Sequence, residues 1–258
     1  MTRVKALLLA AGFGSRLHPL TEIWPKCLMP IGGVPLLEYW LAELEKLNVQ
    51  DVLVNTHFHS EKVQEFLERE IFKDRVNHKY EEQLLGTAGT LYENLEYFLG
   101  NTVLFIHGDN WSQCNFKEFL NYHFSNRPEN TLMTMMTFRT SAPENCGIVE
   151  LDDNGVVHGF HEKVLDPPGN LANASIYLLD PEILELMRDR PTATDFDIEI
   201  IPELLGKIAT WENTGIHRDI GYQEALKLAQ QDPLPQLGLH HWDSWLKEFA
   251  SHPIHEYV

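Results

Sequence analysis

The first half of the chain alternates short apolar runs with segments whose apolar residues recur at helical spacing. Between Leu36 and Leu47 the apolar side chains share one helical face, which predicts a helix there. Strands are predicted at residues 5–10, 51–55, 76–80 and 102–107. A further helix is expected to begin near Thr87, after the break at Gly86. Such alternation is typical of crossover connections within a parallel sheet.

The second half of the chain has a different pattern, because apolar segments follow one another with little helix between them. Strands are predicted at residues 131–138, 147–151, 156–161 and 172–179. The run from Asp152 to Gly155 is rich in turn-forming residues and indicates a hairpin. We therefore expect an antiparallel extension of the sheet, followed by helices at residues 181–188 and 198–207.

These patterns predict an α/β fold with a Rossmann-like, mixed, mainly parallel sheet flanked by helices. A single domain is expected over residues 1–230, and residues 231–258 form a C-terminal tail. In the tail, apolar residues have helix-like spacing at Trp242, Trp245, Leu246 and Phe249. A short helix packed on the domain is the favoured interpretation, and a subunit contact in a homo-oligomer is the alternative.

Composition narrows the classes of partner. With 43% hydrophobic and 22% charged residues, the 258-residue chain is ordinary for a folded globular protein. The formal net charge of −18 argues against binding to nucleic acid or to an anionic membrane. An acidic protein still binds a nucleotide when a few cations share a pocket with a divalent metal ion. Three separated cysteines predict no disulfide framework and favour a cytoplasmic location.

A glycine loop, Gly12-Phe13-Gly14-Ser15-Arg16, directly follows the first predicted strand. Glycines allow the backbone to approach a phosphate closely, although the pair alone fits a tight turn equally well. The loop lacks the Gly-Lys-Ser/Thr ending of a Walker loop. It also has Leu17 where a dinucleotide fingerprint has its third glycine.

The longer stretch LAAGFGSRLHPLTEIWPKCLMPIGGVPLLEY, from Leu9 to Tyr39, resembles the signature of the sugar nucleotidyltransferase family. That signature has a Gly-x-Gly-Thr/Ser-Arg loop, then Pro-Leu-Thr, then Pro-Lys-x-Leu-x-Pro. The resemblance extends over about residues 4 to 228. Within the family, the sequence most resembles mannose-1-phosphate guanylyltransferase-like members. It implies catalytic roles for Arg16 and Lys26, two cations that offset triphosphate charge. It also implies nucleotide contacts at Ala11, Gly12 and Gly14.

Further motifs follow in the family's order. Leu85-Gly86-Thr87-Ala88-Gly89 resembles the family's LGTAG segment, which makes Gln83, Gly86 and Gly89 candidates for contact with the base. A helix that simply opens after a glycine break is the alternative. The family's Gly-Asp is matched at Gly108-Asp109, and its second acidic metal ligand at Asp219. The resemblance therefore implies that Asp109, which is also catalytic, and Asp219 hold Mg²⁺.

Two later segments resemble the parts of the family that bind the sugar phosphate. The pair Glu162-Lys163 matches a Glu-Lys motif, in which Glu holds sugar hydroxyls and Lys the phosphate, and a surface ion pair is the alternative. Asn173 lies in a segment that resembles Asn-Ala-Gly-Ile-Tyr, with Ser175 in place of the glycine. Asn173 and the backbone at Gly147 are expected to contact the sugar.

By resemblance the chain is a transferase that joins an NTP to a sugar-1-phosphate and releases pyrophosphate, within nucleotide-sugar biosynthesis. Residues 1–125 are the expected nucleotide-binding part and residues 126–230 the sugar-binding part. GTP and a mannose- or heptose-like sugar are favoured, and a uridylyl- or thymidylyltransferase on glucose-1-phosphate is the alternative. A glycosyltransferase and a noncatalytic nucleotide-sugar sensor are the competing classes. His240 and His241 have no carboxylates at zinc spacing in the sequence, so solvated or core histidines are favoured.

Overall fold

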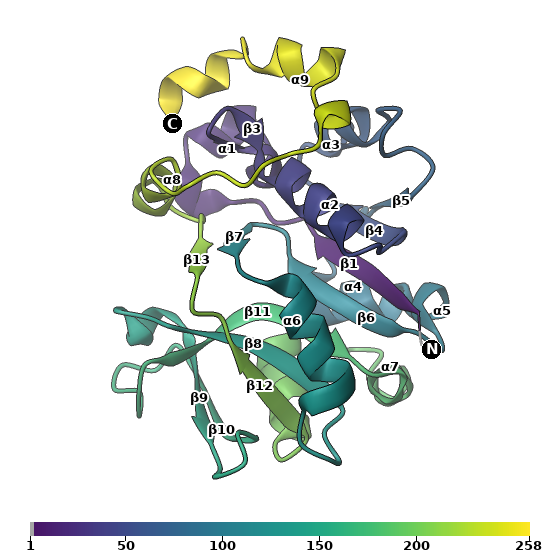
Figure 1. Cartoon of the computed structure of the whole chain (residues 1–258), viewed down its shortest axis with the longest axis vertical. Coiled ribbons are helices and arrows are strands. Elements are labelled where there is room, and N and C mark those ends of the chain that lie inside the picture. Colours follow the sequence, from purple (N-terminus) through teal and green to yellow (C-terminus); the bar gives the residue numbers. More distant parts are fainter. Residues whose placement is uncertain (1–2) are drawn as a thin grey trace. The chain divides into compact units, whose positions relative to one another are not determined.

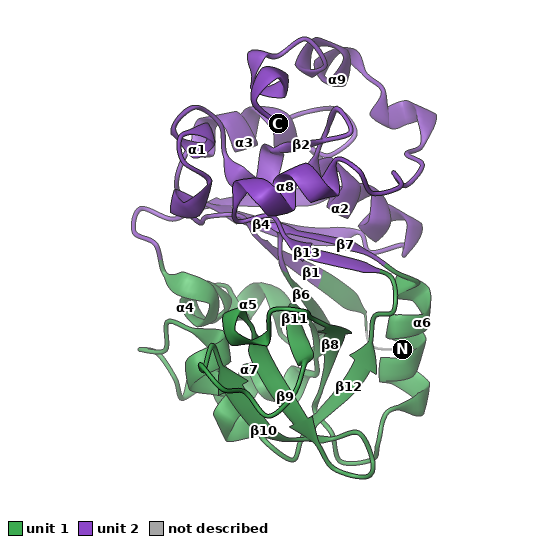
Figure 2. Cartoon of the chain, turned by 90° about the vertical axis from the view of Figure 1, so that its left-hand side faces the viewer, with its two compact units in different colours: residues 1–5, 85–106, 114–215 green, residues 6–84, 107–113, 216–258 purple. Residues whose placement is uncertain are grey.

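The computed structural model describes residues 3–258 and divides them into two units. Unit 1 contains residues 85–106 and 114–215 together with the start of the chain (Figure 2). Unit 2 contains residues 6–84, 107–113 and 216–258. Each unit is thus assembled from segments that are far apart in the sequence.

Unit 2 contains most of the parallel part of the sheet. Its strands here are β1 (Val4–Leu9, from Ala6 on), β4 (Asp51–Thr56) and β5 (Val76–Tyr80), which lie in that order (Figure 1). Strands β4 and β5 are parallel, from Val52 opposite Val76 to Thr56 opposite Tyr80. The middle of β1 is fully buried, which explains why Ala6, Leu7 and Leu8 are all apolar.

Helices alternate with these strands along the chain. They are α1 (Leu20–Ile23), α2 (Leu36–Lys46) and α3 (Ser60–Leu67), and a short ribbon of β2 (Pro30–Ile31) and β3 (Val34–Pro35) precedes α2. Helix α2 begins after Pro35, with Glu38 in its first turn and Lys46 in its last, as the helix dipole favours. Its apolar face is buried, as the periodicity of residues 36–47 predicted.

A second small ribbon completes unit 2. It pairs β7 (Asn110–Gln113) with β13 (Ile216–Asp219) in antiparallel register, and helix α8 (Gln223–Ala229) follows. The tail then forms η7 (Leu239–His241), α9 (Ser244–Phe249) and η8 (Pro253–Tyr257). Phe249 is buried and stacks on Trp24, with ring centroids 5.6 Å apart. The tail therefore packs on its own unit, as the favoured interpretation predicted.

Unit 1 contains the antiparallel extension. Its strands are β6 (Thr102–His107, all but its last residue), β8 (Met133–Arg139), β9 (Gly147–Leu151), β10 (Val157–Glu162), β11 (Leu171–Leu179) and β12 (Ile208–Glu212). Strand β11 pairs antiparallel with β6, β8 and β9, and β10 pairs antiparallel with β9. The predicted turn at Asp152 joins β9 to β10 as a hairpin, with the Gly155 amide donating to the Asp152 carbonyl. Strand β12 departs from the antiparallel pattern, because it pairs parallel to β8.

The helices of unit 1 are α4 (Gly86–Glu93), α5 (Leu95–Phe98), α6 (Phe116–Asn121) and α7 (Pro181–Arg188). The α-helix predicted over residues 198–207 is wrong. A π-helical turn, η5 (Phe196–Ile200), leads instead into a 3₁₀ turn, η6 (Ile201–Leu204). Pro202 has no backbone N–H and interrupts the α-helical ladder, while the Asp195 carboxylate caps the start of η5.

The predicted fold class, an α/β fold with a mixed, mainly parallel sheet flanked by helices, is confirmed. The strands predicted at residues 76–80, 102–107 and 147–151 have those bounds in β5, β6 and β9.

Candidate active site

The glycine loop leaves the carboxyl end of β1 and leads into a 3₁₀ turn, η1 (Ser15–Leu17). Gly14 has φ +63°, a left-handed conformation that favours glycine. A Cβ atom there would lie 2.8 Å from Cγ2 of Thr21 and 3.3 Å from Cβ of Lys26. The Thr21 hydroxyl donates a 2.9 Å hydrogen bond to the Gly14 carbonyl. Glycine at this position thus lets the loop lie against the segment that carries Lys26.

Two buried polar residues, Asn55 and Glu81, hold the start of this loop. The Ala10 amide donates to Oδ1 of Asn55 at 2.8 Å, and Nδ2 of Asn55 donates to Oε1 of Glu81 at 2.9 Å. Sequence reasoning missed both residues. The sequence pattern could have identified them, because each is a polar residue at or just after the carboxyl end of a predicted parallel strand.

The β7–β13 ribbon brings together the two carboxylates that the resemblance named as metal ligands. Asp219 lies opposite Asn110, the neighbour of Asp109, and the Ile220 amide donates to the Asp109 carbonyl at 3.4 Å. The two aspartates are 110 positions apart in the sequence. Strand pairing alone therefore explains how they reach one site.

Lys26 lies between these carboxylates. Its Nζ is 2.5 Å from Oδ2 of Asp109 and 3.1 Å from Oδ1 of Asp219. Its side chain is only 7% exposed, whereas those of Asp109 and Asp219 are 37% and 42% exposed. Arg16 is more open to solvent and donates from Nη2 to Oδ2 of Asp219 at 3.0 Å. Four of the predicted residues thus form one cluster of two cations and two anions.

The contacts within the cluster favour the charged forms of Lys26 and Asp219. Burial alone would lower the pKa of the Lys26 ammonium, but the carboxylates of Asp109 and Asp219 outweigh it and raise that pKa above its usual value. Burial likewise opposes ionisation of Asp219, but the cations of Lys26 and Arg16 lower the pKa of its carboxyl group. Lys26 and Asp219 are therefore charged at neutral pH.

Gly221 is a site residue that the candidate set did not include. A Cβ atom there would lie 2.8 Å from Nη2 of Arg16, 2.8 Å from Oδ1 of Asp219 and 3.0 Å from Nζ of Lys26. The Gly221 amide also donates to Oδ1 of Asp219 at 2.8 Å. The glycine after Asp219-Ile220 is thus required by the close approach of the three charged groups.

The predicted base-contact residues are divided between the units. Gln83 is exposed in the loop after β5 in unit 2, while Gly86 and Gly89 belong to α4 in unit 1. Gly86 has φ +78°, and a Cβ atom there would lie 2.3 Å from the Thr194 carbonyl oxygen. The Ala88 amide donates to that same oxygen at 3.0 Å. Close packing of α4 on the loop before η5 accounts for the glycine at position 86.

Unit 1 brings three of the predicted sugar-phosphate residues together. Gly147 and Glu162 lie opposite each other in the β9–β10 pair, and a Cβ atom on Gly147 would lie 2.5 Å from Oε2 of Glu162. Nζ of Lys163 lies 2.5 Å from Oε1 of the same glutamate. Lys163 is held in a left-handed conformation at φ +48°, and its amide donates to the Cys146 carbonyl.

Asn173 lies in β11, which pairs with β9 through Ala172 opposite Ile148. Its Oδ1 accepts the Ser175 amide at 2.9 Å, and its Nδ2 donates to the Tyr177 hydroxyl at 2.6 Å. That hydroxyl donates in turn to Oδ1 of Asp197 at 2.6 Å. Burial and the neighbouring carboxylate raise the pKa of Tyr177, which keeps it protonated as a donor.

These hydrogen bonds fix the orientation of the Asn173 side-chain amide. The Asp195 side chain caps the start of η5. Asp197, however, orients a candidate sugar-contact residue through Tyr177. The strand register shifts between Asn173 and Tyr177, and Ser175 adopts φ +53° there. That irregularity was not visible in the sequence pattern.

An α/β unit with a glycine loop, two cations and two carboxylates near its strand ends has the arrangement of nucleotide-binding α/β proteins. The family model described as nucleotidyl transferase matches residues 5–234. The chain therefore belongs to the nucleotidyl transferase family. Within residues 3–258, none of the helices has the length and apolar character needed to cross a membrane.

Named relatives agree with this family. Mannose-1-phosphate guanylyltransferase of Mycobacterium tuberculosis is 28% identical over 229 residues, which cover 86% of this chain and 62% of that protein. The bifunctional protein GlmU of Methanocaldococcus jannaschii is 33% identical over 184 residues, which cover 70% and 41%. The chain thus spans at most about three fifths of the length of these relatives.

A solved structure supports the fold. A crystal structure from Bacillus anthracis, described as that of a candidate glucose-1-phosphate thymidylyltransferase in complex with sucrose, superposes with a TM-score of 0.77. It is 22% identical in sequence, and the match covers 88% of this chain and 94% of that one. The likeness establishes the same α/β fold.

Proposed function

We propose that the protein is a Mg²⁺-dependent sugar-1-phosphate nucleotidyltransferase, with GTP and a mannose- or heptose-like sugar-1-phosphate as its favoured substrates. In this reaction an oxygen of the sugar phosphate attacks the α-phosphorus of the NTP. A new P–O bond forms, the bond to the β-phosphate bridging oxygen breaks, and pyrophosphate leaves with that electron pair. The products are an NDP-sugar and pyrophosphate.

The observation that carries this proposal is the cluster of Lys26, Arg16, Asp109 and Asp219 beside the glycine loop. Two anions must meet in the reaction, so catalysis depends chiefly on positioning and on stabilising negative charge. Lys26 is held almost buried, which makes it a fixed cation for the triphosphate. Arg16 is exposed at the end of the glycine loop and is assigned to binding the leaving pyrophosphate. Ala11, Gly12 and Gly14 present the loop backbone to the nucleotide.

The donor set of this cluster fits magnesium. Both carboxylates approach one Nζ atom, so a single cation is within reach of both. Hard carboxylate oxygens are the ligands that Mg²⁺ prefers in nucleotide sites, with phosphate oxygens completing its coordination. The four side chains alone have no net charge, so further positive charge is needed to hold a triphosphate. When bound, Mg²⁺ supplies that charge and polarises the phosphoryl oxygens.

The sugar phosphate is assigned to the group in unit 1. Lys163 is the only cation among the four predicted residues there and is assigned to the phosphate. Glu162 and Asn173 are assigned to the sugar hydroxyls, with the backbone at Gly147 beside them. The Asn173 amide is oriented by Tyr177 and Asp197, which supports a recognition role for it. For the base, Gln83, Gly86 and Gly89 remain the proposed contacts.

The proposed identities of the base and the sugar rest on sequence likeness. The LGTAG segment and relatives named as mannose-1-phosphate guanylyltransferases favour GTP and mannose-1-phosphate. Gln83 and the thymidylyltransferase description of the similar fold favour the alternative, a thymidylyl- or uridylyltransferase on glucose-1-phosphate. Arg16, Lys26 and Asp109 are all retained, which argues against a noncatalytic sensor.

The test is a grid of five NTPs against several sugar-1-phosphates with Mg²⁺, read by the release of pyrophosphate. We expect the highest kcat/KM with GTP and mannose-1-phosphate or a heptose-1-phosphate. A maximum with dTTP or UTP and glucose-1-phosphate would transfer the assignment to the alternative. Absence of pyrophosphate release in every pair would contradict the proposed activity itself.

Replacing Lys163 with alanine is expected to raise the KM for the sugar phosphate at least about tenfold, with a smaller effect on the KM for NTP. A charge-assisted contact to phosphate contributes about 1.5–3 kcal/mol, and 1.4 kcal/mol corresponds to tenfold. Steady-state kinetics with each substrate varied in turn measures the two constants. Lys207, an exposed lysine of the same unit, provides the control variant Lys207→Ala. Equal changes in both KM values would make the Glu162–Lys163 pair a surface ion pair.

Replacing Gly221 with alanine is expected to lower kcat about 10- to 100-fold, because it displaces the charged groups of the cluster by up to about 1 Å. The contacts are with the flexible ends of Arg16 and Lys26, so the fold should survive. Gly169→Ala is the control, since no atom lies within 4 Å of a Cβ there. Kinetics and thermal melts of both variants provide the comparison. Equal turnover in the two variants would contradict the close-approach argument.

A further inference from the structure

Three metal-binding side chains meet at the junction between α2 and the tail. Glu45 lies in the last turn of α2, while His240 and His241 form the end of η7. One ligand atom from each residue lies within 4.8 Å of the other two. Nε2 of His240 is 3.0 Å, and Nε2 of His241 3.1 Å, from the same oxygen, Oε2 of Glu45. The carboxylate that the sequence lacked near these histidines is thus supplied from 195 positions away.

The two ring nitrogens of His241 face two different carboxylates. Nδ1 contacts Oε1 of Glu38, which is fully buried, and Nε2 lies 3.1 Å from Oε2 of Glu45. His241 itself is 1% exposed. The contact with Glu38 thus holds the ring with Nε2 directed at Glu45.

An arginine also reaches the Glu45 carboxylate. Nη2 of Arg75 lies 3.3 Å from Oε2 of Glu45. Arg69 pairs with Glu38 and also with Asp243, at 2.8 Å in the latter case. Two carboxylates, Glu38 and Glu45, are thus each partly neutralised by an arginine.

The distances suit a zinc-sized ion. Ligand atoms bound to one tetrahedral zinc ion at about 2.0–2.1 Å lie roughly 3.3 Å apart. The two observed separations, 3.0 and 3.1 Å, are near that value before any adjustment of the side chains. The contact from His241 to Glu38 matches the carboxylate–histidine–metal arrangement, in which an outer carboxylate fixes the ring and its tautomer.

We propose that Glu45, His240 and His241 form a binding site for Zn²⁺ or a similar borderline divalent ion. Two imidazoles and one carboxylate are a zinc-type donor set, whereas Mg²⁺ prefers oxygen ligands alone. The side chain of His240 is 52% exposed, which leaves the fourth coordination position open to water. The ion joins the tail to α2 at a place where Arg69 already donates to Asp243 and to the His241 carbonyl.

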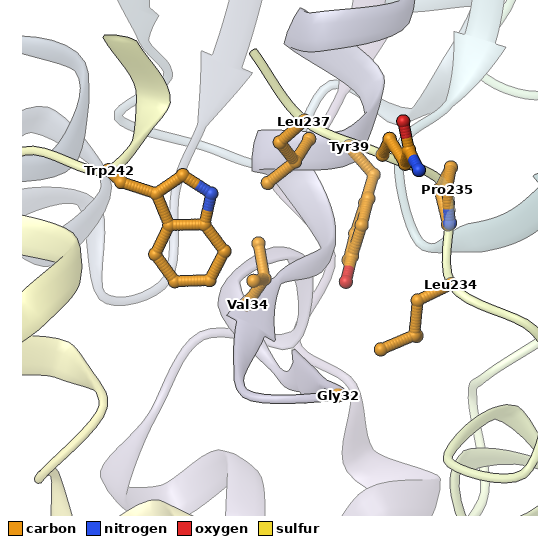
Figure 3. Close-up of a pocket in the computed structure, with 8 residues that line it drawn as sticks. Gly32, Val34, Tyr39, Leu234, Pro235, Leu237 and Trp242 are labelled. Carbon is orange, nitrogen blue, oxygen red and sulfur yellow. The ribbon is translucent and has the colours of Figure 1, made fainter. Parts of the chain in front are cut away.

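The ion also fixes the wall of a neighbouring pocket. This pocket, of about 320 Å³, is lined by Val34 and Tyr39 and by tail residues that include Leu237 and Trp242 (Figure 3). Trp242 directly follows His241 in the chain. Metal binding therefore holds the indole in place, and this site is separate from the proposed catalytic cluster in its residues and in its preferred metal.

The test is binding of Zn²⁺ to the 258-residue chain stripped of metal, by calorimetry in the presence of millimolar Mg²⁺. We expect one high-affinity Zn²⁺ per chain, and affinity at least about tenfold weaker in His240→Ala and in Glu45→Gln. His158→Ala, which removes an exposed histidine from unit 1, is the control and should bind as the wild type does. Zn²⁺ should also slow amide hydrogen exchange in α9 of the wild type but not of His240→Ala.

Two results would overturn the proposal. One is wild-type affinity in His240→Ala, a variant expected to remain folded because the His240 side chain is 52% exposed. The other is loss of the tight Zn²⁺ in Asp109→Asn, which would place the ion in the catalytic cluster instead. Neither readout requires enzymatic turnover, so the zinc site stands or fails independently of the proposed nucleotidyltransferase activity.

Discussion

Replacing Lys26 with alanine is expected to lower kcat about 100-fold while the protein remains folded. Loss of one preorganised group that stabilises transition-state charge typically costs about 10²- to 10³-fold. Here the loss also leaves the carboxylates of Asp109 and Asp219 facing each other and the incoming triphosphate. Both are more than one third exposed, so water can solvate them and the fold should persist.

Single-turnover rates and thermal melts test this expectation. Lys46→Ala is the matched control, because Lys46 is a half-exposed lysine of the same unit that pairs only loosely with Glu43. The control should retain wild-type turnover. If Lys26→Ala also stays within twofold of the wild type, Lys26 has no part in the mechanism.

Asp109→Asn and Asp219→Asn are each expected to remove most activity, about 100-fold or more, and the double variant should be little worse than the poorer single one. The two carboxylates share Lys26 and are proposed to share one Mg²⁺, so their effects cannot be independent. Raised Mg²⁺ should partly restore either single variant, because concentration offsets lost affinity. Double-mutant kinetics across a Mg²⁺ series measures both effects.

Asp153→Asn serves as the control for this cycle, since Asp153 is an exposed turn residue of unit 1. Losses that simply multiply in the double variant, with no response to Mg²⁺, would assign Asp109 and Asp219 to separate roles. The shared-metal model would then be wrong even if each aspartate proved essential.

Elements with a strong local pattern were predictable. Strands β5, β6 and β9 have the predicted bounds because each is a short run with β-forming residues between clear breaks. Helix α7 begins at Pro181, as predicted, since proline is favoured in the first turn. The helix predicted over residues 198–207 is wrong for an equally local reason, because Pro202 has no N–H to continue the α-helical hydrogen bonds.

Elements made by distant pairing were not predictable. Strands β7 and β13 read Asn-Trp-Ser-Gln and Ile-His-Arg-Asp, with no period that marks a strand. Each is stabilised by the other rather than by its own propensity. Asp219 was therefore reached through the family resemblance alone. Physical reasoning from the sequence had no means of placing it beside Asp109.

Supporting polar contacts were hidden for a similar reason. Tyr177 looked like one more apolar position of β11, and its hydroxyl acquires a role only when Asp197 arrives from another segment. Glu38 and Glu45 looked like ordinary acidic positions on α2. Their seven-residue spacing puts them on the same face of the helix, but the tail histidines that give this face its chemistry lie about 200 positions away.

The β7–β13 pairing also bears on the order in which the molecule forms. It closes a loop of about one hundred residues, since residues 114–215 lie between the two strands. Closing so long a loop is entropically costly, and contacts of high sequence separation tend to form late in folding. During synthesis, Asp109 emerges from the ribosome long before Asp219. We therefore expect the carboxylate pair to be one of the last features to assemble, and a nascent chain holds no complete set of the proposed catalytic residues until Asp219 has been added.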